Sequence, residues 1–411
     1  MTIDAAGPLA GVTVLDLSRV LAGPWATQVL ADLGAEVIKV ERPGAGDDTR
    51  SWGPPFAEDA AGEPGDAAYF FSANRNKRSI TVDMATGEGS ALLRRLVADA
   101  DVLVENFRTG GLKKYGLDWE SLRGANRRLV YCSITGFGQD GPWATRAGYD
   151  YMIQAVGGLM SITGQADGEP GAEPMKVGVA VADLFTGLYA SNAILAALLH
   201  ARTTGEGQRI DMSLFEAQTA MLANQASNWF ASGQPPQRMG NAHPNLAPYQ
   251  PFATADGSIV IAVGNDGQFR SLCRAVGAPE LGADPRFAVN ALRVANRTAL
   301  VEALAPLFAA DATDGWIARL EAARVPCGPI NSIDKVFDTP QARARDLVVE
   351  QIRPDLKAPV RTVASPIRLS ATPVAYRRPP PALGADTREV LGERLGLDAA
   401  ELDRLAAAGV I

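Results

Sequence analysis

The sequence predicts an α/β fold, with an open parallel sheet in a large domain and a second, smaller α+β domain. Two observations support this prediction. Strand and helix patterns alternate through the first third of the chain, and the composition changes near Ser232, where a stretch rich in glycine, proline and asparagine begins. A β-α-β-α order is typical of parallel sheets with helices on both faces.

Short runs rich in valine, isoleucine and leucine predict the strands of the large domain. These runs cover residues 12–17, 36–40, 79–82, 101–105 and 129–134. Between the first two runs, Pro24 suits the first turn of a helix and Gly34 suits its C-terminal end. A further helix is expected over 87–97. Because no Gly-x-Gly-x-x-Gly motif follows the first strand, the sequence does not indicate a dinucleotide site.

The smaller domain is expected to begin after a strand at 209–212 and a helix that reaches about residue 231. A hairpin turn at 255–258 leads into a strand at 259–263. Helices are then expected over 268–276, 296–309 and 313–323. The tail from about residue 346 returns to short strands, and 377–381 is interpreted as a solvated linker into a terminal helix near 388–395.

The composition excludes several classes of protein. The 411 residues are 47% hydrophobic and 21% charged with a net charge of −7, which is typical of a soluble globular protein and argues against a nucleic-acid partner. We expect no membrane association, because no secretory signal and no uninterrupted apolar run of the ~18 residues that a membrane span requires were identified. Three dispersed cysteines suit a reducing cytoplasm, and two histidines without a Cys/His cluster argue against a metal site.

One aspartate, Asp183, stands out because it lies in an otherwise apolar stretch. Small residues precede it and the apolar run 184–199 follows it. This pattern predicts a loop that delivers Asp183 to the start of a helix, where the positive field of the helix N-terminus would act on it. Taken alone, the segment favours a helix N-cap, since aspartate is among the best N-cap residues.

Eight motifs, in order along the chain, resemble those of the family III CoA-transferases, the group of formyl-CoA:oxalate and carnitine CoA-transferases. The α-methylacyl-CoA racemases share that fold. The motifs are LAGVTVLD (9–16) with AGP (22–24), LGAEVIKVERP (33–43), NRNKRSI (74–80), VENFR (104–108), TGFG (135–138), GEGQ (205–208), VPCGP (325–329) and LGADT (383–387).

The resemblance implies a Rossmann-like large domain built from both ends of the chain, and two subunits interlaced as linked rings. The residue patterns place the small α+β domain with its linkers at 221–339. The resemblance assigns 1–220 to the N-terminal part of the large CoA-binding domain and 340–411 to its return. The expected partners are acyl-CoA and carboxylic acid substrates and a second copy of the chain.

The resemblance also implies covalent catalysis by Asp183, which falls where the family has its nucleophilic aspartate. The carboxylate would carry CoA as an aspartyl thioester between a donor acyl-CoA, such as succinyl-CoA or another dicarboxyl- or hydroxyacyl-CoA, and an acceptor acid. Coenzyme A would enter only as part of the substrate, and no permanently bound cofactor is required.

The residues expected at the CoA site lie mainly in loops at the carboxyl ends of strands, where open α/β sheets bind ligands. By resemblance, Arg42 and Lys114 would neutralise phosphate and Phe107 would pack near the adenine. Lys77 and Arg78 are further phosphate candidates, with a solvated turn as the alternative, and Arg146 is a weaker one. The full set is Leu21, Ala22, Arg42, Lys77, Arg78, Asn106, Phe107, Lys114 and Arg146.

Tyr149 separates the chain from its racemase relatives, which carry His-Asp after a glycine and use the histidine as a base. Here the stretch is Gly148-Tyr149-Asp150. Tyrosine, with an ordinary pKa of about 10, is a poor carbon-acid base at neutral pH, so Tyr149 is expected to orient substrate, with ordinary packing as the alternative. A racemase or isomerase and a catalytically dead CoA-binding paralogue remain the competing functions.

The stretch 239–245 lies where formyl-CoA transferases have a glycine run that closes over the intermediate. Its version here is stiffer, with Gly240 and Asn241 followed by Pro244. It is expected to gate the site, with an acid other than oxalate as substrate. His243 is a candidate contact for a substrate carboxylate, and a solvated or capping histidine is the alternative.

Overall fold

The computed structural model describes residues 7–411, which divide into two compact units. The larger unit takes in the chain up to Leu159, then Val177–Ala223 and Ala344–Ile411; the smaller contains Met160–Lys176 and Asn224–Arg343. The expectation that 160–176 belong to the large domain is therefore wrong. These residues cluster with the smaller unit because backbone bonds tie them to it, including one from Gly240 N to Gly164 O at 3.0 Å.

A six-stranded sheet forms the centre of the larger unit. Its strand order is β5-β2-β1-β6-β7-β8, and every neighbouring pair is parallel. The strands are β1 (Thr13–Asp16), β2 (Glu36–Glu41), β5 (Lys77–Thr81), β6 (Val102–Glu105), β7 (Val130–Thr135) and β8 (Arg209–Ser213). This confirms the α/β class, and each predicted strand is present within a few residues of its expected bounds.

Helices cover both faces of this sheet. Neighbouring residues of β1 show the two faces directly: Val14 belongs to the apolar cluster shared with α1 and α6, whereas Leu15 belongs to the cluster shared with α3 and α15. The helices of the larger unit are α1 (Ala22–Asp32), α2 (Ala68–Phe71), α3 (Gly87–Ala98), α4 (Trp119–Leu122), α5 (Asp150–Val156), α6 (Val181–Thr204), α7 (Leu214–Met221), α15 (Thr387–Leu395) and α16 (Ala399–Ala407). Two antiparallel pairs, β3 (Phe56–Glu58) with β4 (Pro64–Ala67) and β12 (Val348–Gln351) with β13 (Val360–Val363), complete it.

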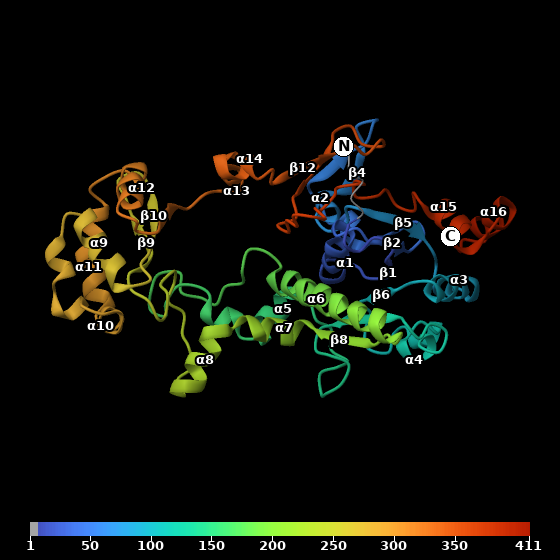
Figure 1. Ribbon diagram of the computed structural model, residues 1–411, viewed down its shortest axis with the longest axis horizontal. Helices are drawn as coiled ribbons and strands as arrows, with labels where there is room; N and C mark the ends of the chain where they lie inside the picture. Colours follow the sequence, from blue (N-terminus) through green and yellow to red (C-terminus); the bar gives the residue numbers. More distant parts are fainter. Residues whose placement is uncertain (1–6) are drawn as a thin grey trace. The chain divides into compact units, whose positions relative to one another are not determined.

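The end of the chain returns to the sheet and lies beside its edge strand, as the blue and red segments of Figure 1 show. Ser79 N donates to Asp386 Oδ2 at 2.8 Å, and Thr81 N donates to Thr387 Oγ1 at 2.9 Å. The stretch 377–381 is exposed at Arg377 and Arg378, as expected of a solvated linker, but it is bonded to the rest of the larger unit. Asn76 accepts from Arg377 N at 2.6 Å, and the Arg377 guanidinium donates to carbonyls at the end of α1.

Helix α6 has the length and composition of a membrane span, the only helix in residues 7–411 that does, so the expectation that no such segment exists is wrong. One side of α6 packs closely on α1. A Cβ added at Gly187 would lie 2.7 Å from the Ala22 carbonyl oxygen, so this glycine permits the close approach of the two helices. The other side leaves Leu188, Tyr189 and Leu199 exposed.

The smaller unit has a three-stranded antiparallel sheet in the order β11-β10-β9. Its strands are β9 (Tyr249–Ala253), β10 (Ser258–Ala262) and β11 (Cys327–Pro329), and its helices are α8 (Ala223–Ser232), α9 (Asp266–Ala275), α10 (Asn290–Ala295), α11 (Arg297–Phe308), α12 (Thr313–Ala322) and α13 (Ile333–Asp338), with α14 (Pro340–Ala344) at the boundary. The single helix expected up to residue 231 is two helices, because Ala223, the first residue of α8, adopts a positive φ of 40°.

Candidate active site

The structure brings together the loops that follow β1 and β6. Asn106, directly after β6, clamps the backbone of Arg19 in the loop between β1 and α1. Its Oδ1 accepts from Arg19 N at 2.9 Å and its Nδ2 donates to Arg19 O at 2.7 Å. The Arg19 guanidinium lies 5.6 Å from the centre of the Phe107 ring, which is half-buried. Two of the predicted CoA contacts, Asn106 and Phe107, therefore flank one well-fixed loop.

The same loop contains a strained residue. Val20 has a φ of 70°, a region that β-branched side chains rarely adopt. Both carboxylate oxygens of Asp47 accept from Val20 N at 3.2 Å and hold it there. Leu21 and Ala22, which follow, are buried at the start of α1, and their contact with CoA stays a prediction. Strain of this kind persists where surrounding contacts fix it, and it is common at ligand-binding loops.

Three of the predicted cations are exposed. Arg42 directly follows β2 at the same edge of the sheet as the two loops. Lys114 Nζ lies 4.6 Å from the centre of the Tyr115 ring, and the Arg146 guanidinium lies 4.7 Å from that of Trp143. Their exposure leaves them open to a phosphate, and their part in CoA binding stays a prediction.

Lys77 and Arg78 are not phosphate ligands, because both are buried and bonded within the protein. Lys77 Nζ pairs with Asp16 at 3.1 Å and donates to Asn74 Oδ1 at 2.9 Å. Arg78 forms ion pairs with Glu36 at 2.9 Å and Glu389 at 3.0 Å, and so joins the sheet edge to α15. The solvated-turn alternative is also wrong for this pair.

Lys77 belongs to a buried network of charges beneath the β1–α1 loop. Burial lowers the pKa of Lys77 to about 8 although Asp16 opposes the shift. Lys39 Nζ donates to Asp47 at 2.8 Å. Burial alone would raise the pKa of Asp47, but Lys39 outweighs it and the pKa falls to about 2. The carboxylate that holds Val20 therefore stays ionised over the physiological pH range.

Asp183 is the third residue of α6 and not its N-cap, which is Ala180. Its side chain is half-buried, and within residues 7–411 no cation forms an ion pair with it. Burial, and then the negative charge of Asp150, raise the pKa of Asp183 to about 7. A carboxylate with these properties is more basic than an ordinary one and is still ionised in about half of the molecules at neutral pH.

Two residues near Asp183 escaped the sequence analysis. Asp150, the first residue of α5, accepts from Ala182 N at 2.7 Å and from Asp183 N at 3.4 Å. Tyr69 in α2 stacks edge-to-face on Trp52, and its pKa is raised to about 12 by burial and then by the negative charges of Asp183 and Asp150. Tyr69 is therefore a protonated hydroxyl within electrostatic reach of Asp183. The Gly-Tyr-Asp stretch could have indicated Asp150; no pattern singles out Tyr69.

Tyr149 immediately precedes Asp150 and is 67% exposed. Ordinary core packing is therefore not its role, and the phenol is free to contact a ligand. Its part in orienting substrate stays a prediction.

The predicted gating residues lie in the smaller unit. Gly240 has a φ of 59° and Asn241 is exposed. The Nδ1 atom of His243 accepts from Asn245 N at 3.0 Å, and its ring stacks on Tyr249. His243 thus caps its own turn, which was the alternative to a substrate contact. The proposed closing motion of this loop stays a prediction.

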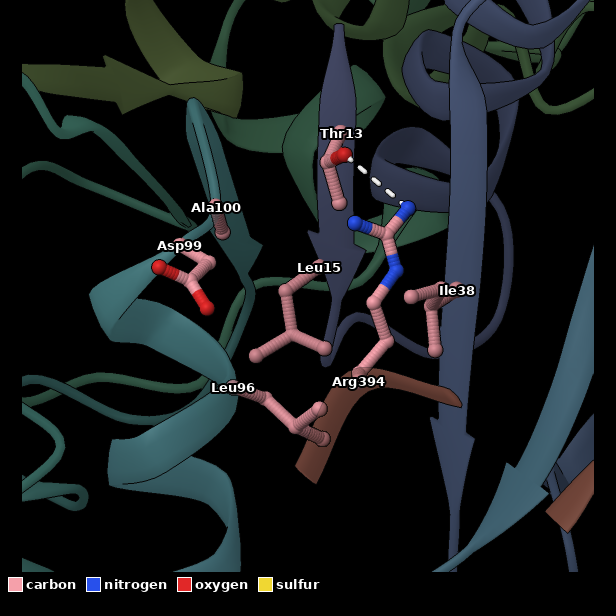
Figure 2. A pocket seen from close by; sticks show the side chains of 7 residues that line it. All are labelled: Thr13, Leu15, Ile38, Leu96, Asp99, Ala100 and Arg394. Atoms are coloured by element: carbon pink, nitrogen blue, oxygen red, sulfur yellow. Dashed lines mark hydrogen bonds between the residues drawn. The ribbon is translucent and has the colours of Figure 1, made fainter. Parts of the chain in front are cut away.

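The cavity in Figure 2 is not the active site. It is lined by Thr13, Ala100 and Arg394 among others, at the end of β1 opposite to the loops described above, and its volume is about 10 Å³. Such a space holds at most one water molecule. Within residues 7–411, no cluster of three histidine, cysteine or acidic side chains has the arrangement of a metal site.

Comparison with known proteins decides the family. The model of CoA-transferase family III matches residues 9–387. The chain is a family III CoA-transferase. The transferase is 54% identical to a succinate–glutarate CoA-transferase of Agrobacterium fabrum over 390 residues, which cover 94% of this chain and 95% of that protein. It is 44% identical to a human succinyl-CoA:glutarate CoA-transferase, with coverage of 98% and 90%.

A solved structure extends the likeness to the fold. A CaiB/BaiF family protein from Brucella suis is 51% identical to the transferase and superimposes with a TM-score of 0.83, with coverage of 95% of this chain and 100% of that one. The transferase therefore moves CoA between an acyl-CoA and a carboxylic acid, as the resemblance of its motifs implied.

Proposed function

We propose that this transferase moves CoA from succinyl-CoA to a short dicarboxylic acid such as glutarate, through a thioester on Asp183. The names of the relatives from Agrobacterium fabrum, mouse and human support this choice of donor and acceptor. The observation that carries the mechanism is the half-buried Asp183 carboxylate, which has no cationic partner within residues 7–411 and a raised pKa of about 7.

The chemistry requires four balanced steps. A carboxylate oxygen of Asp183 attacks the thioester carbonyl of the donor and expels CoA thiolate. The product on the enzyme is a mixed anhydride between Asp183 and the donor acyl group. The thiolate attacks Cγ of Asp183, which forms the aspartyl-CoA thioester and releases succinate. An acceptor carboxylate attacks Cγ and expels the thiolate again, and the thiolate then takes the acyl group of the acceptor and frees Asp183.

The raised pKa favours the first step. Nucleophilic strength rises with basicity, so a carboxylate with a pKa near 7 attacks a thioester more readily than one with a pKa near 4. At neutral pH about half of the enzyme carries the ionised form, so protonation removes only about a factor of two from the gain in reactivity.

The first experiment follows the intermediate. The enzyme is incubated with succinyl-CoA alone, and the Asp183 peptide is weighed by mass spectrometry. The peptide should gain the mass of CoA less water, and glutarate should discharge it. Asp183→Asn should prevent the adduct, whereas Asp140→Asn, which changes an exposed aspartate in a loop, should not. Absence of a discharging adduct in the wild type would contradict the covalent route.

A second experiment separates transfer from the racemase alternative. The enzyme is incubated with a 2-methylacyl-CoA in deuterated water, and deuterium at the α-carbon is followed. We expect none, because Tyr149 stands where the racemases have their histidine base. Rapid incorporation would favour the racemase. Transfer by the wild type that depends on Asp183 would in turn dismiss the catalytically dead paralogue.

We also propose that the enzyme acts as a homodimer in the cytoplasm. Exposed apolar side chains on α6 support a partner subunit: Leu188 and Tyr189 are each 44% exposed and Leu199 is 70% exposed. The three cysteines are unpaired, in keeping with a reducing compartment. Native mass spectrometry should show two copies, and Leu199→Glu should reduce that assembly. A wild-type monomer would contradict the dimer.

A further inference from the structure

Asp150 makes contacts that bear directly on the nucleophile. Its Oδ1 accepts from the backbone N–H groups of Ala182, at 2.7 Å, and Asp183, at 3.4 Å. Its Oδ2 accepts from Gln154 Nε2 at 2.7 Å, and Gln154 Oε1 accepts from Val177 N at 2.9 Å. One carboxylate therefore ties together the start of α5, the first turn of α6 and the segment that leads into α6.

The first turn of α6 consequently offers no free backbone donor. Val181 N donates to Val179 O at 2.8 Å and Leu184 N to Ala180 O at 3.0 Å, while Asp150 takes the two amides between them. A helix N-terminus normally presents unpaired amides and a partial positive charge, which would stabilise an anion and weaken its basicity. Here another carboxylate already occupies that position.

We propose that Asp150 is a positioning residue for the transfer reaction, which cancels the field of the α6 N-terminus at Asp183 and thereby keeps the Asp183 carboxylate basic enough to attack a thioester. This inference rests on the proposed function, because it assigns Asp183 as the nucleophile.

Electrostatics and geometry agree on this role. Asp150 is the one charged group within residues 7–411 that shifts the pKa of Asp183, and it acts in the same direction as burial. The other titratable group coupled to the pair is Tyr69, which also responds to Asp47 and stays protonated because its pKa is about 12. Within the described chain, no cation lowers the pKa of Asp183 and so offsets the repulsion between the two carboxylates.

The test compares Asp150→Asn with the wild type. An asparagine amide keeps an acceptor oxygen for Ala182 N and removes the charge, although its Nδ2 group can no longer accept from Gln154 Nε2. The cap on α6 is therefore kept while the field of the carboxylate is lost. The titration of Asp183 is followed by ¹³C NMR of its carboxyl carbon, assigned with Asp183→Asn, and the rate of aspartyl-CoA formation from succinyl-CoA is measured across pH.

We expect Asp150→Asn to lower the midpoint of the Asp183 titration by about one unit. Adduct formation at pH 8, where both carboxylates are ionised, should slow by about threefold, because nucleophilic rates follow roughly half of a change in pKa, and KM for succinyl-CoA should stay near the wild-type value. Asp140→Asn should leave all three measurements unchanged. An unshifted midpoint in a folded Asp150→Asn protein overturns the inference, since a purely structural cap would alter only stability.

The two proposals fail in different ways. If wild-type enzyme forms no adduct, the proposed function is wrong, while the NMR midpoint still reports whether Asp150 controls Asp183. If the wild type forms the adduct but Asp150→Asn has a normal midpoint and rate, only the role of Asp150 is wrong. If Asp150→Asn is unstable, Asp150→Glu takes its place. Because this variant keeps the negative charge, the midpoint of the Asp183 titration must stay as high as in the wild type.

Discussion

Asp183→Asn is expected to inactivate the enzyme and also to stabilise it. The pKa of Asp183 rises from 3.8 to about 7 on folding, chiefly through burial. Between these values the native state retains a proton that the unfolded chain has lost. The wild type therefore loses stability as pH rises through this window, and the full loss is present above about pH 7. Asparagine carries no such penalty.

The magnitude follows from the shift. About three pKa units at about 1.4 kcal/mol each give a ceiling of about 4 kcal/mol. Because the carboxyl is partly open to solvent, we expect about half, roughly 2 kcal/mol in favour of Asp183→Asn at pH 8. Charged active-site residues commonly impose such a cost on the fold.

Urea unfolding monitored by circular dichroism at several values between pH 4.5 and pH 8 provides the measurement. The advantage of Asp183→Asn should grow with pH and level off above about pH 7. Asp140→Asn should show no advantage and full activity. An advantage that is independent of pH, or a wild type that is the more stable protein at pH 8, would refute the reasoning.

Three further predictions concern the loops around the site. Arg42→Ala should raise KM for CoA esters about tenfold or more and leave KM for the free acid unchanged, as steady-state kinetics would show; an unaltered KM for the ester would remove this residue from the CoA site. Lys77→Met should destabilise the protein by about 3–5 kcal/mol in urea, because it leaves Asp16 buried without its partner; a near-normal midpoint would contradict this. Asn106→Ala should release the backbone of Arg19 and so raise KM for succinyl-CoA. An unchanged affinity for the ester, measured by calorimetry, would contradict this prediction.

The alternation of strands and helices was predictable because most strands of the sheet contain a short apolar run, although β5 begins with Lys77 and Arg78 and β8 alternates charged and apolar residues. Adjacent residues such as Val14 and Leu15 pack on opposite faces, so the whole run is apolar. The helix after α15 was missed, although Asp398 at the N-cap of α16 and Glu401 three residues later form a start signal that the sequence contains. The break between α7 and α8 depends on one positive φ at Ala223, which its sequence does not indicate.

The candidate site was predictable only in part. Asp183 stood out because it is one charge in an apolar stretch. Lys77 and Arg78 were misinterpreted because their partners, Asp16 and Glu389, lie 61 and 311 positions away and meet them only in the folded sheet. A run of charges appears solvated in a sequence whenever its counterions are remote.

The return of the chain end to β5 has a consequence for how the protein folds. The bond from Ser79 N to Asp386 joins residues 307 positions apart, and Asn76 depends on Arg377 in the same way. Such contacts close very long loops, and chains dominated by them fold slowly. During synthesis, the first strands leave the ribosome long before their last partners exist. The sheet edge at β5 is therefore left uncovered until residues 377–387 have been synthesised, a period in which a chaperone would be of most use.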